Sequence, residues 1–178
     1  MSILDICTWL EASAPAVAIS ESEWLFPAIE TVHVLALSML FGSIAMLDLR
    51  LLGLANKHRG VQQFSQEILP WTWSAFVIAA ISGALMFISA ATKYYDNIPF
   101  RIKIVLLALA GLNMAVFHLT GYRSVATWGD KVKTPRAARI AAALSMVLWI
   151  GVVFAGRWVG FVDESTPPEF AEASGEQN

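Results

Sequence analysis

The chain contains little cysteine, histidine or charge, and each of these scarcities removes some classes of function. Cys7 is the only cysteine among 178 residues, which excludes an internal disulfide and a covalent CxxCH haem attachment. Zinc motifs, glycine-rich phosphate loops and serine or cysteine nucleophile arrangements are also missing from the sequence. Lys and Arg together number 12 against 14 Asp and Glu, a balance that does not indicate nucleic-acid binding.

Apolar residues, by contrast, make up 57% of the chain and gather in four long runs. The runs lie near residues 24–47, 70–91, 102–122 and 137–161. Each is long enough to cross the hydrocarbon core of a bilayer, which takes about 20 residues. They must be helices, because only a helix satisfies its own backbone hydrogen bonds in lipid. Short connections then predict an all-α, up-down-up-down four-helix bundle over residues 24–162.

The two ends of the chain are expected to lie outside this bundle. Residues 1–23 contain no Lys or Arg, which does not fit a cleaved signal peptide. Ile3, Ile6 and Trp9 recur at helical spacing and predict a short amphipathic helix lying in the membrane interface. Residues 163–178 are acidic and without an apolar period, so we expect a disordered tail.

Basic residues predict the orientation of the bundle in the membrane. Most of them lie in the connections after the first and third apolar runs: Arg50, Lys57, Arg59, Arg123, Lys131, Lys133, Arg136 and Arg139. Because basic loops stay on the cytoplasmic side, we expect both termini on the opposite side.

Two pairs of small residues at helical spacing indicate close helix contacts. Gly156 and Gly160 form one pair in the fourth run, and Ser38 and Gly42 form another in the first. Such pairs serve either packing within the bundle or a contact between two chains in a homodimer. Both interpretations stay open from the sequence.

Ionisable residues inside the first run are candidates for function, because burying them in hydrocarbon is costly. Glu30 and Asp48 are eighteen residues apart, or five turns of about 3.6 residues, and so share one helix face. His33 lies within about 60° of that face, which we expect to point into the bundle. Glu30 would then either accept the second ring N–H of His33, as carboxylates do beside metal-bound histidines, or the two side chains would simply neutralise each other. A di-iron site is excluded, since it needs a second Glu-x-x-His pair.

The third run contains His118, with Gly111 seven residues before it on the same helix face. A glycine two turns from a histidine either leaves room for the edge of a flat macrocycle or serves ordinary packing. Imidazole is a frequent ligand of haem iron. The two intramembrane histidines, His33 and His118, therefore predict a non-covalently bound haem b with these side chains as metal ligands.

Several segments resemble a known but uncharacterised family of small bacterial four-span membrane proteins. They are residues 24–33 (Trp-Leu-Phe-Pro-Ala-Ile-Glu-Thr-Val-His), 48–53 (Asp-Leu-Arg-Leu-Leu-Gly), 94–97, 100–103 and 113–118. More distantly, the layout is similar to that of bacterial haem-binding protoporphyrinogen oxidases and copper-resistance D membrane proteins. The resemblance implies that His33 is an axial haem ligand and that Arg50 and Lys103 are supporting charges. It also implies a bacterial inner membrane as the location.

The two histidines are not expected at the same depth in the membrane. In an up-down bundle the first and third helices are parallel, which places His33 and His118 roughly 15 Å apart along the axis. Two separate haems would resolve this, with Met86 or water beside His33 and with His58 beside His118. Alternatively, one histidine is a ligand and the other is structural.

The sequence therefore favours a b-type haem membrane protein in electron transfer, with quinone or a small redox substrate as its partner. Lys103 and Arg101 would either pair with haem propionates or extend to lipid headgroups. The alternative function is a non-catalytic membrane subunit of a larger complex. In that case Glu30, His33 and Asp48 would hold helices together, and the small-residue pairs would contact the partner.

Overall fold

The computed structural model describes residues 2–55, 61–120 and 134–164, and within these ranges every regular element is a helix. The helices are α1 (Ile3–Glu11), α2 (Ala14–Ser20), α3 (Leu25–Leu52), α4 (Val61–Ser89), α5 (Ala91–Asp96), α6 (Ile98–Thr120) and α8 (Arg136–Glu164). Four of them, α3, α4, α6 and α8, are long and apolar enough to cross a membrane, with mean hydropathy between 1.8 and 2.0 over their most apolar stretch. The prediction of an all-α protein with four spans is confirmed.

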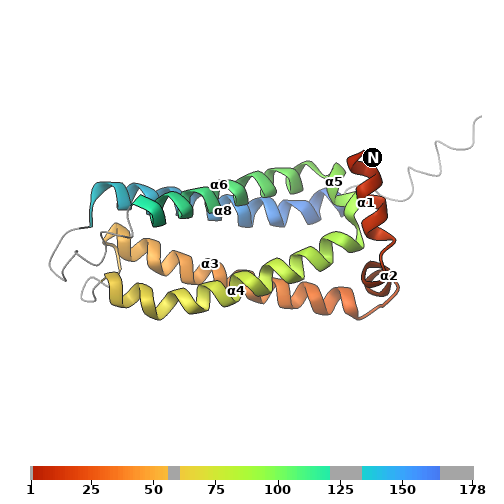
Figure 1. Ribbon diagram of the computed structural model, residues 1–178, viewed down its shortest axis with the longest axis horizontal. Helices are drawn as coiled ribbons and strands as arrows, with labels where there is room; N and C mark the ends of the chain where they lie inside the picture. Colours follow the sequence, from red (N-terminus) through yellow and green to blue (C-terminus); the bar gives the residue numbers. More distant parts are fainter. Residues whose placement is uncertain (1, 56–60, 121–133, 165–178) are drawn as a thin grey trace, which may run out of the picture.

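The four long helices run up and down beside one another (Figure 1). α3 packs against α4, α6 packs against α8, and α3 also packs against α8, which joins the two pairs. Within the described ranges α4 and α6 share no comparable contact. The bundle is therefore less tightly closed along its α4–α6 side than elsewhere.

The second span begins earlier than the apolar run indicates. α4 starts at Val61, so Pro70 lies inside the helix and not at its beginning. Proline has no N–H to donate, which costs one helical hydrogen bond, but membrane helices tolerate this because side chains supply substitutes. Around Pro70, the Ser74 hydroxyl donates to the Pro70 carbonyl (2.9 Å), and the Thr72 hydroxyl lies 3.1 Å from the Ile68 carbonyl.

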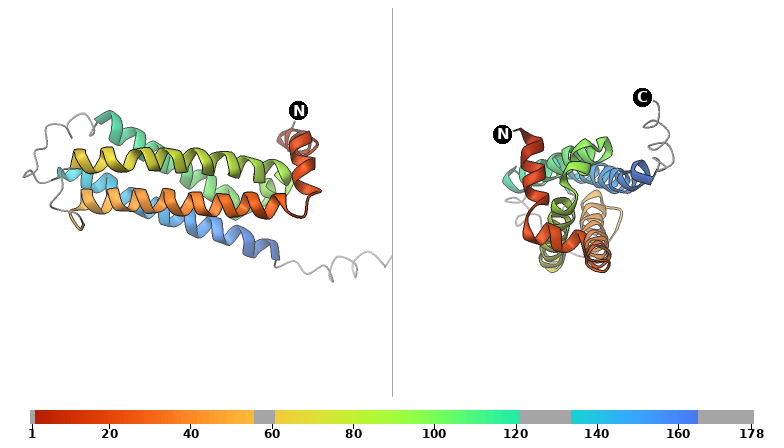
Figure 2. Two further views of the ribbon diagram at one scale, coloured as in Figure 1. Left: turned by 90° about the horizontal axis from the view of Figure 1, so that it is seen from below. Right: turned by 90° about the vertical axis from the view of Figure 1, so that its right-hand side faces the viewer.

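The N-terminal segment forms two helices, which corrects the prediction of one. α1 and α2 meet at an angle of 67° and lie across one end of the bundle (Figure 2). The chain bends after Glu11, and Pro15 in the first turn of α2 starts a new helix, where its missing N–H costs nothing. The Glu11 carboxylate accepts hydrogen bonds from the Thr92 N–H (2.8 Å) and hydroxyl (2.7 Å), which ties α1 to the start of α5.

Polar side chains fix the register of neighbouring helices. Between α3 and α4, the Thr72 hydroxyl donates to the Ser43 hydroxyl at 2.9 Å, and His33 Nδ1 lies 2.9 Å from the Ser82 hydroxyl. Both contacts fit one antiparallel register, since His33 and Ser43 are separated by the same number of residues as Thr72 and Ser82. Between α6 and α8, the Asn113 side-chain amide donates to the Ala141 carbonyl at 3.0 Å.

The end of the bundle that carries α1 and α2 also carries the start of α3, the start of α6 and the last turns of α8 (Figures 1 and 2). The predicted disordered tail lies outside the described residues, except for its first two positions at the end of α8. The candidate residues His33 and Lys103 both belong to this end of the bundle.

Candidate functional site

His33 lies in the third turn of α3, and its ring points toward α4. The Ser82 hydroxyl has a single proton, which it donates to the Ile78 carbonyl at 2.6 Å. The Ser82 oxygen lies 2.9 Å from His33 Nδ1, and a tautomer with the proton on Nδ1 lets it accept from the ring while it donates to Ile78. The Ala79 carbonyl interacts with the same ring. In this tautomer Nε2 would carry the lone pair, as it does in a ligating histidine.

The absence of a side chain at Gly83 allows His33 to approach α4 this closely. A Cβ atom at Gly83 would lie 2.9 Å from Cε1 of the His33 ring and 3.5 Å from Nδ1. Real Cβ atoms essentially never make contacts this short, so any side chain here would displace the ring. Gly83 and Ser82 together therefore determine the position of the imidazole.

Lys103 places a positive charge near this histidine from the opposite pair of helices. Its side chain is partly buried and packs against α8, with Nζ 3.7 Å from the position of a Cβ at Gly156. The charge of Lys103 acts on His33 across the bundle. Within the described ranges, the ammonium group of Lys103 is partly withdrawn from solvent, and no carboxylate pairs with it. A buried cation without a counter-ion favours an anionic ligand in this part of the bundle.

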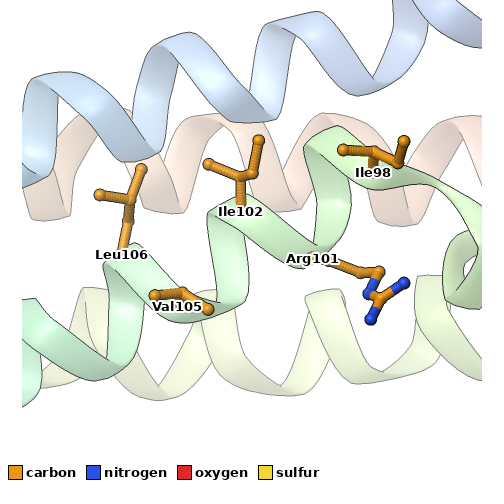
Figure 3. A pocket seen from close by; sticks show the side chains of 5 residues that line it. All are labelled: Ile98, Arg101, Ile102, Val105 and Leu106. Carbon is orange, nitrogen blue, oxygen red and sulfur yellow. The ribbon is translucent and has the colours of Figure 1, made fainter.

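A shallow groove of about 290 Å³ runs along the outer surface of α6 close to Lys103. Its lining residues are Ile98, Arg101, Ile102, Val105 and Leu106 (Figure 3). In the figure Arg101 and Val105 lie on the side of α6 nearer α4, and the other three side chains extend toward α8. One cationic side chain beside apolar walls suits an amphiphile with an anionic or polar head and a hydrocarbon chain.

The prediction that Glu30 orients His33 is wrong. Its side chain is exposed on the outer surface of the bundle, and Ser82 occupies the position of partner to His33 Nδ1. The reason is geometric, because residues three apart differ by about 60° around a helix. The face of α3 that packs on α4 includes His33 and leaves Glu30 outside. Asp48, at the other end of the predicted stripe, is buried.

The structure does not bring the second histidine to the same level as the first. His118 lies in the last turn of α6, roughly 18 Å further along the bundle than His33, and its side chain is outside the described part. Gly111 lies on the exposed surface of α6, where an added Cβ would meet nothing within 4 Å. Arg50 is buried near the end of α3 that is distant from His33.

The other proposed ligands divide between the two ends in the same way. Met86 lies on α4 one turn after Gly83 and is partly buried, so it remains a candidate second ligand near His33. His58 is outside the described residues. Among the described residues, no group of three or more His, Cys, Asp or Glu side chains is placed to hold a metal ion.

Ser82 was not predicted from the sequence as the partner of His33. A signal was present, since an antiparallel register that pairs Ser43 with Thr72 also pairs His33 with Ser82. That register could not be chosen without knowing which faces of the two helices meet.

Fold and composition together define a multi-pass helical membrane protein. A family model described as a family of unknown function (DUF6644) matches residues 25–162, and the chain belongs to that family. The matched region spans all four long helices and includes both His33 and Lys103. No curated protein and no solved structure shows significant similarity to the chain. The resemblance to an uncharacterised family is thus confirmed, while the likeness to haem proteins remains a prediction.

Proposed function

We propose that the protein is a b-type haem membrane protein that transfers electrons, with His33 as an axial ligand. The observation that carries this proposal is the orientation of His33. Its Nδ1 lies 2.9 Å from Ser82 Oγ and its ring rests on Gly83, so in the tautomer with a proton on Nδ1 its Nε2 would be the donor atom. When bound, haem would supply reversible one-electron chemistry at its iron.

The surrounding residues suit the other parts of such a ligand. Haem carries two propionates, and Lys103 is a partly buried cation without a carboxylate partner in the described ranges. Arg101 lies two residues away on the more exposed surface of α6. The weak contact between α4 and α6 supports entry of a flat ring from that side. The groove on α6 would hold the edge or the chain of a ligand and would not enclose a whole macrocycle.

The same groove supports quinone as the redox partner. Its walls are apolar, it opens on the surface that faces lipid, and Arg101 lies at its edge. A quinone head would meet the arginine while its isoprenoid chain followed Ile102 and Val105. With the basic connections in the cytoplasm, the His33 end of the bundle would lie on the outer side of a bacterial inner membrane.

The absorption spectrum of the purified full-length protein tests the proposal, and a pyridine haemochrome assay identifies and counts the haem. We expect a Soret band that His33→Ala abolishes and that His118→Ala retains. Ser82→Ala should lower haem occupancy, because the ring loses its anchor. Lys103→Met, a substitution of similar length, should weaken binding by removing the charge that faces the propionates. A colourless wild-type protein expressed with adequate haem supply would contradict the proposal.

A second candidate function, a non-catalytic subunit of a larger membrane complex, is favoured by the position of Glu30. Its carboxylate lies on the outer surface of a membrane-spanning helix, where a polar group of another chain would stabilise it. The open surface at Ser38 and Gly42 lies further along the same helix, beside a cavity of about 280 Å³. Under this alternative, Glu30→Gln would reduce the native mass of the assembly without any change in absorbance.

A further inference from the structure

The end of the bundle distant from His33 contains a buried acid that the proposed haem site does not use. Asp48 lies on α3 near its C-terminal end, with only 6% of its surface exposed. The Ser145 hydroxyl of α8 is its hydrogen-bond partner. Its second oxygen, Oδ2, is buried and has no hydrogen-bond partner among the described residues. The acid therefore lies in the contact between α3 and α8, which joins the two helix pairs.

Among the described residues, no charged group at this end forms an ion pair with Asp48. On its own helix Arg50 is buried, whereas Glu67 of α4 and Arg136 and Arg139 of α8 are exposed. The Ser145 hydroxyl is the one polar side chain in the described ranges that acts on the buried Asp48 carboxyl. Asp48 is thus a buried acid with a single hydroxyl donor and no basic partner in the described ranges.

This environment suits a neutral carboxylic acid better than a carboxylate. A carboxylate buried without a cation loses its hydration and regains only one hydrogen bond, which makes the charged state unfavourable. Oδ2 has no donor directed at it, so a proton on that oxygen removes the charge without displacing any existing contact. Intramembrane acids placed in this way commonly carry protons in membrane proteins.

We propose that Asp48 is a proton-binding site at the joint between α3 and α8. With the joint closed, the carboxyl group holds its proton and Ser145 hydrogen-bonds to it. When the joint opens, the O–H bond breaks, the proton passes to water, and the resulting carboxylate is hydrated. This site goes beyond the proposed haem function and needs neither haem nor His33. It would let this end of the bundle take up or release a proton as the helices move.

Infrared difference spectroscopy of the full-length protein in phosphatidylcholine liposomes at neutral pH tests this site. Subtracting the Asp48→Asn spectrum from that of wild type should show the loss of one carboxylic-acid C=O band. In Ser145→Ala the same band should move to higher frequency, because its hydrogen-bond donor is gone. Glu67→Gln removes an exposed carboxylate at the same end and should leave the band unchanged.

Two further measurements keep the test decisive if Asp48→Asn folds poorly. Asp48→Glu retains an acid and should shift the band instead of removing it, and Ser145→Ala leaves Asp48 in place. Transfer to heavy water should shift the Asp48 band more slowly than it exchanges exposed amides, because opening of the joint limits access. A difference spectrum in which Asp48→Asn removes a carboxylate band, with no change in the acid region, would overturn the proposal. Since no step uses haem, a colourless protein would leave this test valid.

Discussion

The close packing of His33 on Gly83 can be tested by adding a single methyl group. In Gly83→Ala the new Cβ would lie 2.9 Å from Cε1 of His33, so the ring must move and leave Ser82. Overpacking costs about 1–3 kcal/mol, and an interhelical hydrogen bond in a membrane protein contributes about 0.6 kcal/mol. Replacing glycine by alanine inside a helix returns up to about 1 kcal/mol. With the full gain subtracted, the expected net loss of stability is therefore about 0.6–2.6 kcal/mol.

Reversible unfolding in mixed micelles, followed by circular dichroism, measures this loss. Gly42→Ala on α3 is the matched control, because an added Cβ there meets nothing within 4 Å. This control should be neutral or slightly stabilising. In the double variant His33→Ala/Gly83→Ala the clash is absent, so the two single effects should not add. Haem occupancy should fall in Gly83→Ala and stay at the wild-type level in Gly42→Ala.

If Gly83→Ala were as stable as Gly42→Ala and bound the same amount of haem, the described position of His33 would be wrong. Additive effects in the double variant would lead to the same conclusion, since they would show that His33 and residue 83 do not touch.

Three smaller predictions concern the hydrogen bonds that connect helices. Ser43→Ala should cost roughly 0.6 kcal/mol in the same unfolding assay, and in Thr72→Val it should cost nothing further, because the two hydroxyls form one bond. Glu11→Ala should speed hydrogen exchange in α1 and at Thr92 while leaving the long helices protected, because the link between α1 and α5 is lost. Asn113→Leu removes the donor to the Ala141 carbonyl and should destabilise the protein by about as much as Ser43→Ala does. If Ser43→Ala were destabilised while Asn113→Leu were as stable as wild type, the hydrogen bond between α6 and α8 would contribute nothing to stability.

The apolar runs were sufficient to predict the fold, because a lipid environment leaves helices as the solution for uncharged stretches of this length. The start of α4 was missed for a related reason. Residues 61–69 are largely polar and continue the helix beyond its apolar part, so hydropathy alone does not reveal them. The bend between α1 and α2 was also missed, since apolar spacing does not show where a helix is interrupted.

The candidate site was predicted only in part. The cost of burying an ionisable group drew attention to His33, which is partly buried, and to Asp48, which is buried, whereas Lys103 was proposed from the family resemblance and is partly buried. The same argument failed for Glu30, because a helix in a four-helix bundle has a lipid-facing side and periodicity does not say which side that is. Ser82 was invisible to the sequence analysis because its role depends on the register between two helices.

The central claim is that His33 ligates haem iron, and rescue of a cavity variant tests it most directly. His33→Gly should be purified with little or no haem and should regain a Soret band when haem and imidazole are added together. Haem alone should not restore that band, and His118→Gly should not require imidazole. A His33→Gly variant that binds haem as wild type does, with an unchanged spectrum and without imidazole, would contradict the claim.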